Sequence, residues 1–502
     1  MEKYALIDED GILSWDEMTT DDDRDQSPHR LPHTISQALP PTKDDFYANH
    51  CQQYIDFTND NPTTFHVAEY FHNLLVSEGF EYICETSPIT EELARSIDQG
   101  GKFFISRGDL TLIAFVIGPQ WSEKEGLSLV GAHIDVLTAK LKPSSTRPII
   151  DGYETLGVAP YSGAMSKVWL DRDLGIGGSI LVKEGGRVVR KTYKSPGPIA
   201  KVPSLAEHFG LGDIDYNPET QMVPIVGYVS ETDEPIDEAI LKHPLSDDHS
   251  PKLLNYIVKT SGIDIDDIVD IELELYDTQP ATVGGLNDEF LMAPRLDDRL
   301  CGFSAIYGLI EYSKNPKDDD LSMVLLADNE EIGSASRSGA KGQFLTSTVE
   351  RILHVKKGLK SIVFANSMLL SVDVTHCLNP NFKNVYLDNH FPVPNTGISC
   401  KFDPNAHTMT DKVGFNIMKQ IAEKYNGKVQ RFQIRNDGRS GGTIGPMLAT
   451  ETGSRVLDCG LPILSMHSIR AMCGSKEPGI GIECFQNFFQ FWKEIHASYK
   501  GL

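Results

Sequence analysis

Apolar segments of regular spacing occur along most of the chain, and each predicts a strand or a helix. Continuous apolar runs at 127–132, 322–327 and 369–374 predict buried strands, because a strand covered on both faces is apolar at nearly every position. Apolar positions at helical spacing predict helices over 300–312 and 409–425. Strands that alternate with helices are typical of a mainly parallel sheet flanked by helices, so we predict an α/β fold.

The pattern changes along the chain, and these changes predict the domain limits. Residues 1–43 are acidic and then rich in Ser, Pro and Thr, which predicts a loosely packed acidic tail. Residues 44–142 and 288–502 carry the alternating pattern, and we expect them to form one interrupted α/β domain. Residues 143–287 between them predict an inserted β-rich domain, in which the polar run 231–250 is expected to be an exposed loop.

Composition and charge exclude several classes of protein. The 502 residues, 40% of them hydrophobic, are enough for a large core and more than one domain. The net charge of −25 disfavours nucleic acid and anionic membranes as partners. No apolar run is long enough for a membrane span, and the first residues lack the features of a signal peptide. The eight cysteines form no C-x-x-C pair, which indicates reduced thiols in a cytoplasmic protein.

Acidic and histidine side chains occur at or near the ends of several apolar stretches. The most distinctive are Glu330-Glu331, which follow the predicted strand 322–327. Open α/β sheets place their ligands at the C-terminal ends of strands, and there one acid can hold a metal ion while the other accepts a proton. The remaining segments of this kind contain His133-Ile134-Asp135, Asp297-Asp298, Asp373 and His467.

Each of these segments alone has an ordinary structural explanation. A Glu-Glu pair is most often a solvated turn, a single histidine is most often hydrogen-bonded in a core, and Asp298 could cap the helix that follows it. Their occurrence together in one α/β chain favours a metal centre, because two histidines with Asp and Glu suit a divalent cation such as zinc. Asp135 is then spaced to hold the ring nitrogen of His133 that does not bind metal.

These segments resemble the M18 metallo-aminopeptidases, a family that includes aspartyl aminopeptidases and a yeast vacuolar aminopeptidase. The resemblance runs from about residue 44 to the C-terminus. It implies a di-zinc exopeptidase fold with an inserted dimerisation domain, peptide substrates, and a homo-oligomer, a dodecamer built from dimers. It is carried by Gly131-Ala132-His133-Ile134-Asp135, Trp169-Leu170-Asp171-Arg172-Asp173-Leu174, Ala293-Pro294-Arg295-Leu296-Asp297-Asp298-Arg299, Asp328-Asn329-Glu330-Glu331-Ile332-Gly333-Ser334, Ser371-Val372-Asp373, Gly441-Gly442-Thr443-Ile444-Gly445-Pro446 and Met466-His467-Ser468-Ile469-Arg470.

The resemblance also implies a metal ligand at each of five positions. Two zinc ions per subunit would share the bridging carboxylate of Asp297. His133 and Asp373 would complete the first zinc site, and Glu331 and His467 would complete the second.

Catalytic roles follow from the same resemblance. Glu330 would be the general base, and Asp135 would orient His133. His208, in the inserted domain, would reach the active site of the neighbouring subunit and hydrogen-bond the oxyanion formed there.

The sequence leaves the specificity open between two alternatives. Arg439-Ser440-Gly441-Gly442 resembles the vacuolar type of the family, which favours neutral or apolar N-terminal residues. An aspartyl aminopeptidase that prefers N-terminal Asp or Glu is the alternative, with Lys401 and Arg439 as the cations for such side chains.

Other classes of function also remain open at this point. A carboxypeptidase or an amide deacylase uses a similar ligand pattern, and a self-assembling scaffold or autophagy cargo is the non-enzymatic alternative. We expect a cytoplasmic protein, with delivery to a vacuole as the second possibility. The acidic tail, interrupted by Pro, does not resemble the helical propeptide that the vacuolar enzyme uses for that delivery.

Overall fold

The computed structural model describes residues 42–209, 216–230, 235–499 and 501, together with the backbone of two short strands near the N-terminus. These strands pair antiparallel within a unit of their own, Met1–Thr42. The predicted tail, residues 1–43, otherwise lies almost wholly outside the described residues, and all that follows concerns the second unit, Lys43–Leu502. The two strands are β1 (Leu6–Ile7) and β2 (Leu13–Ser14).

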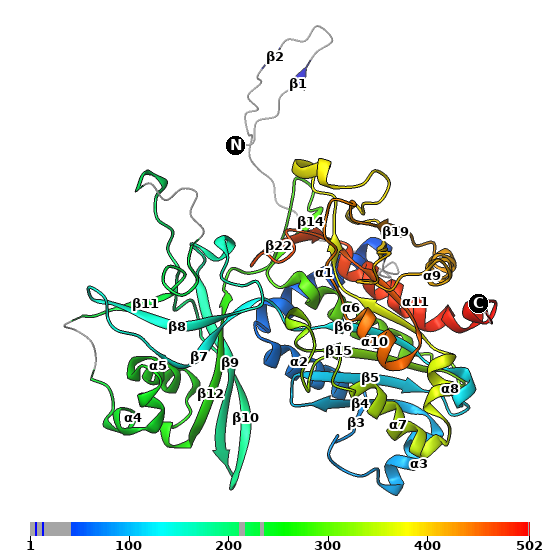
Figure 1. Ribbon diagram of the computed structural model, residues 1–502, viewed down its shortest axis with the longest axis horizontal. Helices are drawn as coiled ribbons and strands as arrows, with labels where there is room; N and C mark the ends of the chain where they lie inside the picture. The colour runs from blue at the N-terminus through cyan, green and yellow to red at the C-terminus, as the bar shows by residue number, and fades with distance from the viewer. Residues whose placement is uncertain are drawn as a thin grey trace, which may run out of the picture. The chain divides into compact units, whose positions relative to one another are not determined.

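A nine-stranded sheet forms the centre of the second unit, as far as the chain is described (Figure 1). Its middle strands β20, β16, β6 and β15 are parallel, whereas β15–β5, β5–β4 and β18–β20 are antiparallel pairs. The predicted α/β fold is confirmed, with the parallel strands at its centre. From one edge to the other the strands are β19 (Val429–Phe432), β18 (Ile398–Lys401), β20 (Arg455–Gly460), β16 (Met368–Val372), β6 (Ser128–His133), β15 (Leu321–Ala327), β5 (Thr111–Ile117), β4 (Gly101–Arg107) and β3 (Glu81–Tyr82).

Helices cover both faces of this sheet, and alternate residues of each strand bury against the two layers. In β15, Val324 and Leu326 belong to one core cluster, while Met323 and Leu325 belong to the other. The first cluster includes side chains of α1 (Lys43–Asp60), α2 (Thr64–Ser77), α6 (Leu296–Ser313), α9 (Lys412–Lys424) and α11 (Glu477–Ala497). The second includes side chains of α3 (Glu91–Gln99), α7 (Phe344–Lys356), α8 (Lys360–Ala365) and α10 (Gly445–Thr452).

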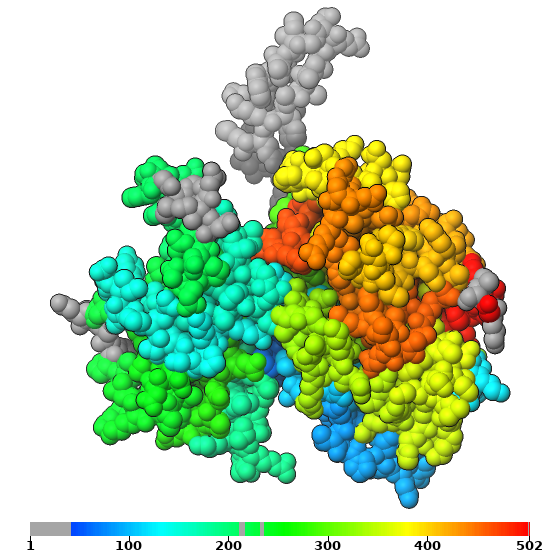
Figure 2. All heavy atoms as spheres, in the orientation of Figure 1, coloured from blue at the N-terminus to red at the C-terminus, as the bar shows by residue number. Residues whose placement is uncertain are grey.

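The insert has an antiparallel sheet and a hydrophobic core of its own, and Figures 1 and 2 show it in cyan to green. The sheet already begins with β7 at Thr138, ahead of the predicted domain start at 143. In order its strands are β10 (Arg187–Lys194), β9 (Leu174–Glu184), β12 (Ile268–Asp277), β7 (Thr138–Thr146), β8 (Tyr153–Tyr161) and β11 (Ile225–Tyr228).

The prediction of an exposed loop over 231–250 is correct in the exposure of most described residues but wrong about the loop. Residues 231–234 lie outside the described residues, but α4 (Glu238–Lys242) and a short 3₁₀ helix, Pro244–Asp247, follow them. Ile240 of α4 is buried in the core of the insert, next to α5 (Pro251–Ser261).

A third sheet contributes side chains such as Leu291, Ile463 and Cys473 to the first core cluster. Among the described residues its strands run in the order β13 (Thr282–Gly284), β14 (Phe290–Ala293), β22 (Ala471–Gly474), β21 (Pro462–Leu464) and β17 (Thr375–His376). None of the helices in the described part of the chain is both long and apolar enough to cross a membrane.

Candidate metal centre

Three of the predicted segments meet because the strands before them are parallel neighbours. His133 is the last residue of β6, Glu330-Glu331 follow β15 in a 3₁₀ turn, and Asp373 follows β16. β6 lies between β15 and β16 in the sheet, and parallel strands end at the same edge. The sheet therefore brings together residues that are far apart in the sequence.

Asp297 lies between the two histidines. Its Oδ1 is 3.4 Å from His133 Nε2 and its Oδ2 is 3.4 Å from His467 Nε2. Two ligands bound to one zinc ion at about 2.0–2.1 Å with tetrahedral angles stand about 3.3–3.4 Å apart. Each oxygen of Asp297 is thus spaced to share an ion with one histidine, which is what a bridging carboxylate requires.

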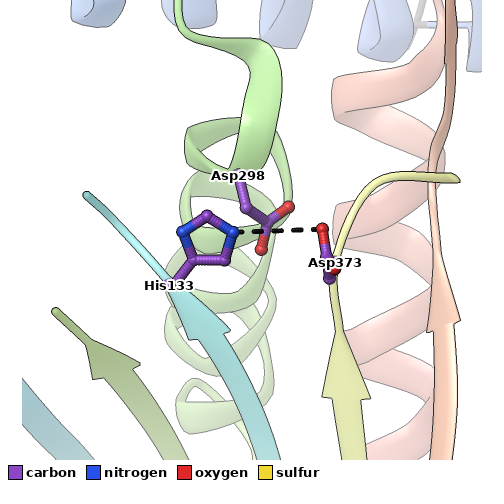
Figure 3. Close-up of side chains that lie close together, drawn as sticks. All are labelled: His133, Asp298 and Asp373. Atoms are coloured by element: carbon purple, nitrogen blue, oxygen red, sulfur yellow. Dashed lines mark ion pairs between the residues drawn. The ribbon is translucent and has the colours of Figure 1, made fainter. Parts of the chain in front are cut away.

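In the described part of the chain, two groups of side chains have ligand atoms within 4.8 Å of one another, and His133 belongs to both. One is His133 with Asp297 and Glu331; the other is His133 with Asp298 and Asp373. Figure 3 shows Asp298 at the start of α6, with its carboxylate near the imidazole of His133 and the carboxylate of Asp373. Asp298 is fully buried; one oxygen accepts the backbone N–H of Val374 at 3.1 Å and the other has no hydrogen-bond partner.

The donor set fits a divalent cation. Oε1 of Glu331 is buried without a hydrogen-bond partner. Burial and the nearby Asp297 raise the pKa of Glu331 to about 9, and burial raises the pKa of Glu330 to about 7. Carboxyl groups crowded in this way retain protons unless positive charge is supplied, and a bound cation supplies it. Two imidazoles with several carboxylates suit zinc.

Asp135 fixes both His133 and the turn that carries the two glutamates. His133 Nδ1 lies 3.1 Å from the backbone carbonyl of Asp135 and 3.3 Å from its Oδ1, which leaves Nε2 for a metal. The carboxylate of Asp135 also accepts the backbone N–H groups of Glu330 and Glu331, each at 3.1 Å. Burial acts to raise the pKa of Asp135, but the hydrogen bond to His133 and the other donors lower it.

The ligand residues line a cleft of about 410 Å³. Ser440, Gly441, Gly442 and Thr443 form part of its wall. Lys401 also lines the cleft, and its Nζ is 3.1 Å from Oδ2 of Asp373, so its charge is already paired. The larger apolar side chains of the lining are Phe402, Phe432, Met447 and Met466.

Comparison with known proteins identifies the family. The model of the aminopeptidase I zinc metalloproteases (M18) matches residues 57–489. The chain belongs to the M18 family. It is 44% identical over 466 residues to vacuolar aminopeptidase 1 of Saccharomyces cerevisiae, covering 90% of each chain. It is 36% identical to aspartyl aminopeptidase 1 of Schizosaccharomyces pombe, covering 87% of this chain and 94% of that one.

A solved structure of the M18 family agrees in fold. The dodecamer of S. cerevisiae mApe1 matches with a TM-score of 0.82 and 42% identity, covering 91% of this chain and 100% of that one. The predicted M18 membership, the fold and the assignment as a zinc aminopeptidase are confirmed by these matches. They favour aminopeptidase action over that of a carboxypeptidase or an amide deacylase.

Some predicted residues of the M18 site are not part of this cluster. His208 lies in a 3₁₀ turn of the insert, Glu207–Phe209, where it is exposed and its ring is 4.8 Å from that of Phe209. It is not among the residues that line the cleft. Arg439 is exposed and is not among them either, although its neighbour Ser440 is.

Asp458 supports the cleft and was missed from the sequence. It is buried in β20, where its carboxylate accepts Oγ1 of Thr443 at 2.6 Å and the backbone N–H of Met409 at 2.5 Å. These bonds join segments on the cleft wall that are distant in sequence. An acid inside the apolar strand 455–460 was the available signal, because a buried charge normally needs hydrogen-bond partners.

Proposed function

We propose that the chain removes N-terminal residues from peptides with two zinc ions bridged by Asp297. The observation that carries this proposal is the position of Asp297, whose two oxygens each face one histidine at 3.4 Å. His133 and Asp373 would complete one zinc site, and Glu331 and His467 the other. Zinc bound in such a site acts as a Lewis acid and makes water a stronger acid at neutral pH.

Glu330 is the general base in this proposal. Its carboxylate lines the cleft, with Oε2 4.0 Å from His133 Nε2, close to where the ligands converge. It takes a proton from the attacking water and returns it to the leaving amine, so that the products are a free amino acid and a shortened peptide. Asp135 keeps the His133 ring oriented while the charges in the site change.

Assembly into a homo-oligomer is part of the proposal. The relative whose structure is a dodecamer is covered completely by this chain, and we infer a dodecamer built from dimers here as well. Exposed apolar side chains on the insert, such as Ile149, Ile150 and Tyr228, are suited to be covered by another subunit. His208 of the partner subunit would donate to the oxyanion, a contribution worth about 10²–10³ in rate.

The cleft supports a preference for neutral or apolar N-terminal residues. Apolar side chains such as Phe402 and Met466 form part of its wall, while the charge of Lys401 is paired with Asp373. An acidic side chain in the cleft would compete with Asp373 for that lysine. The alternative, a preference for N-terminal Asp or Glu, is supported by the aspartyl aminopeptidase among the relatives.

Three chromogenic substrates test both levels of the proposal. Turnover should be highest on leucyl p-nitroanilide, lower on aspartyl p-nitroanilide, and absent on the N-acetyl form of the leucyl compound. Faster cleavage of the aspartyl compound would overturn the specificity but keep the aminopeptidase. Cleavage of the acetylated compound would overturn exopeptidase action at a free amine.

The vacuolar relative supports delivery to a vacuole after synthesis in the cytoplasm. A fluorescent fusion of the full chain, followed through starvation, tests this localisation. Signal that stays cytoplasmic under all conditions would favour the cytoplasm as the final compartment.

A further inference from the structure

One side chain of the insert reaches the residue that holds His133. Tyr161 is the last residue of β8 and is 9% exposed. Its hydroxyl donates to Oδ2 of Asp135 at 2.8 Å and accepts from Nδ2 of Asn329 at 3.0 Å. Asn329 is the residue just before Glu330-Glu331, so Tyr161 contacts both the start of this turn and the carboxylate that accepts its backbone N–H groups.

Asp135 is where the supports of the metal centre converge. Its Oδ1 faces His133 Nδ1 and the N–H of Glu330, and its Oδ2 accepts the N–H of Glu331 and the hydroxyl of Tyr161. The first three donors come from the α/β domain. Tyr161 belongs to the sheet of the insert, and among the described residues it is the donor to the Asp135 carboxylate that comes from this sheet.

We propose that Tyr161 is a positioning residue through which the inserted domain sets the geometry of the zinc centre. It acts on Asp135, which in turn orients His133 and anchors the Glu330-Glu331 turn. The inference rests on the zinc ligands assigned under the proposed function. Beyond any role in assembly, the insert then supports the metal centre through the hydrogen bond from Tyr161 to Asp135.

The connection depends on the hydroxyl group and not on the ring. Tyr161 is opposite Thr138 in the β7–β8 ladder, and Lys140 Nζ lies 4.8 Å from the centre of its ring. Both contacts survive in phenylalanine. A polar cavity of about 180 Å³ adjoins Tyr161, Asp135 and Asn329, so water can enter and replace the lost hydroxyl in part. We therefore expect a moderate loss.

The experiment compares Tyr161→Phe with Tyr193→Phe in the full-length, assembled and zinc-loaded enzyme. Tyr193 is a matched control, because it is a buried tyrosine of the same sheet whose hydroxyl bonds Thr260 Oγ1 at 2.7 Å, a partner outside the metal centre. The measurements are zinc release to a chromogenic chelator, kcat and KM on leucyl p-nitroanilide, and the Tm of the zinc-free protein.

Tyr161→Phe should release zinc about tenfold faster and lower kcat about as much, as is typical when a group that orients a metal ligand is lost. KM and the Tm of the zinc-free protein should stay at wild-type values, and Tyr193→Phe should leave zinc release and kcat unchanged. Wild-type zinc release and kcat in Tyr161→Phe would overturn the inference. So would a lowered Tm of the zinc-free protein with unchanged zinc release, which would indicate packing only.

A double-mutant cycle with Asp135→Asn tests whether Tyr161 acts through Asp135. Once Asp135→Asn is present, Tyr161→Phe should accelerate zinc release little further, since both changes break the same chain of contacts. Additive effects would show that Tyr161 acts by another path and would overturn the inference. If the wild-type enzyme bound no zinc at all, the proposed function would fail before this inference was reached.

Discussion

Glu330 and Glu331 are adjacent in sequence but have different roles in the proposed mechanism, and isosteric amides separate those roles. Glu330→Gln keeps the size of the side chain and the backbone N–H that bonds Asp135. It removes the proton acceptor. Glu331→Gln removes a charged ligand whose Oε1 is buried without a hydrogen-bond partner. The two variants are therefore matched in chemistry and differ by one position.

The expected magnitudes follow from these positions. The Glu330 side chain is 14% exposed and faces the cleft, so loss of its proton transfer should lower kcat by about 10²–10⁴, or about 3–5 kcal/mol of barrier. Zinc content should stay at two ions per subunit, because Glu330 is not a ligand in this account. Glu331→Gln should lose both activity and about one zinc ion, since an amide oxygen is a weaker ligand than a carboxylate.

Zinc content by mass spectrometry and kcat on leucyl p-nitroanilide, measured on the same samples, decide between the roles. Zinc loss in Glu330→Gln that matches its loss of activity would refute the assignment of Glu330 as base. Turnover of Glu330→Gln within a few-fold of wild type would refute it too. Full zinc content in Glu331→Gln would remove Glu331 as a ligand.

Two further predictions concern residues outside this pair. His208→Ala should lower kcat about 10²–10³-fold with unchanged zinc content. If His208 of the partner subunit serves the site, oligomers that mix His208→Ala with Glu330→Gln subunits should regain activity. Zinc loss, or no recovery in mixed oligomers, would contradict this role of His208. Glu477 is buried, and burial raises its pKa to about 8 from an ordinary value of 4.5. Between pH 4.5 and about 8 the folded protein therefore keeps a proton on Glu477 that the unfolded chain has released. The resulting stabilisation of the folded state is complete below pH 4.5 and is lost as pH rises through about 8. In the wild type, the free energy of unfolding measured with urea should fall by on the order of 4 kcal/mol between pH 5 and 8 because of Glu477, and Glu477→Gln should abolish this fall. Equal pH dependence of variant and wild type would contradict the prediction.

The central strands could be predicted from the sequence because both of their faces are buried, which makes β6, β15 and β16 continuous apolar runs. The start of α11 could not be predicted from the sequence. Its apolar pattern becomes clear near Cys484, but the helix begins at Glu477, through Pro478, Gly479 and Gly481. A Cβ at Gly479 would lie 2.6 Å from Tyr47, and one at Gly481 would lie 2.6 Å from Ser304. The glycines serve tertiary packing that local sequence does not reveal.

In the site, too, local patterns could be read from the sequence, whereas contacts between distant segments could not. Each expected ligand stands at the end of an apolar run or in a segment that resembles the family, so the sequence alone was enough to propose it. The residues that hold these ligands could not be predicted, because Tyr161 and Asp458 take their meaning from partners distant in sequence. Asp298 was considered as a helix cap, whereas its carboxylate in fact lies within the ligand cluster. Only the folded chain shows that Asp298 lies beside His133 and Asp373.

Anomalous diffraction at the zinc edge, from crystals of the zinc-loaded wild-type enzyme, locates the metal ions relative to Asp297. We expect two peaks per subunit, one on either side of the Asp297 carboxylate. One peak should lie beside His133 and Asp373, and the other beside Glu331 and His467. A single peak, or two peaks that do not share Asp297, would refute a di-zinc centre bridged by Asp297.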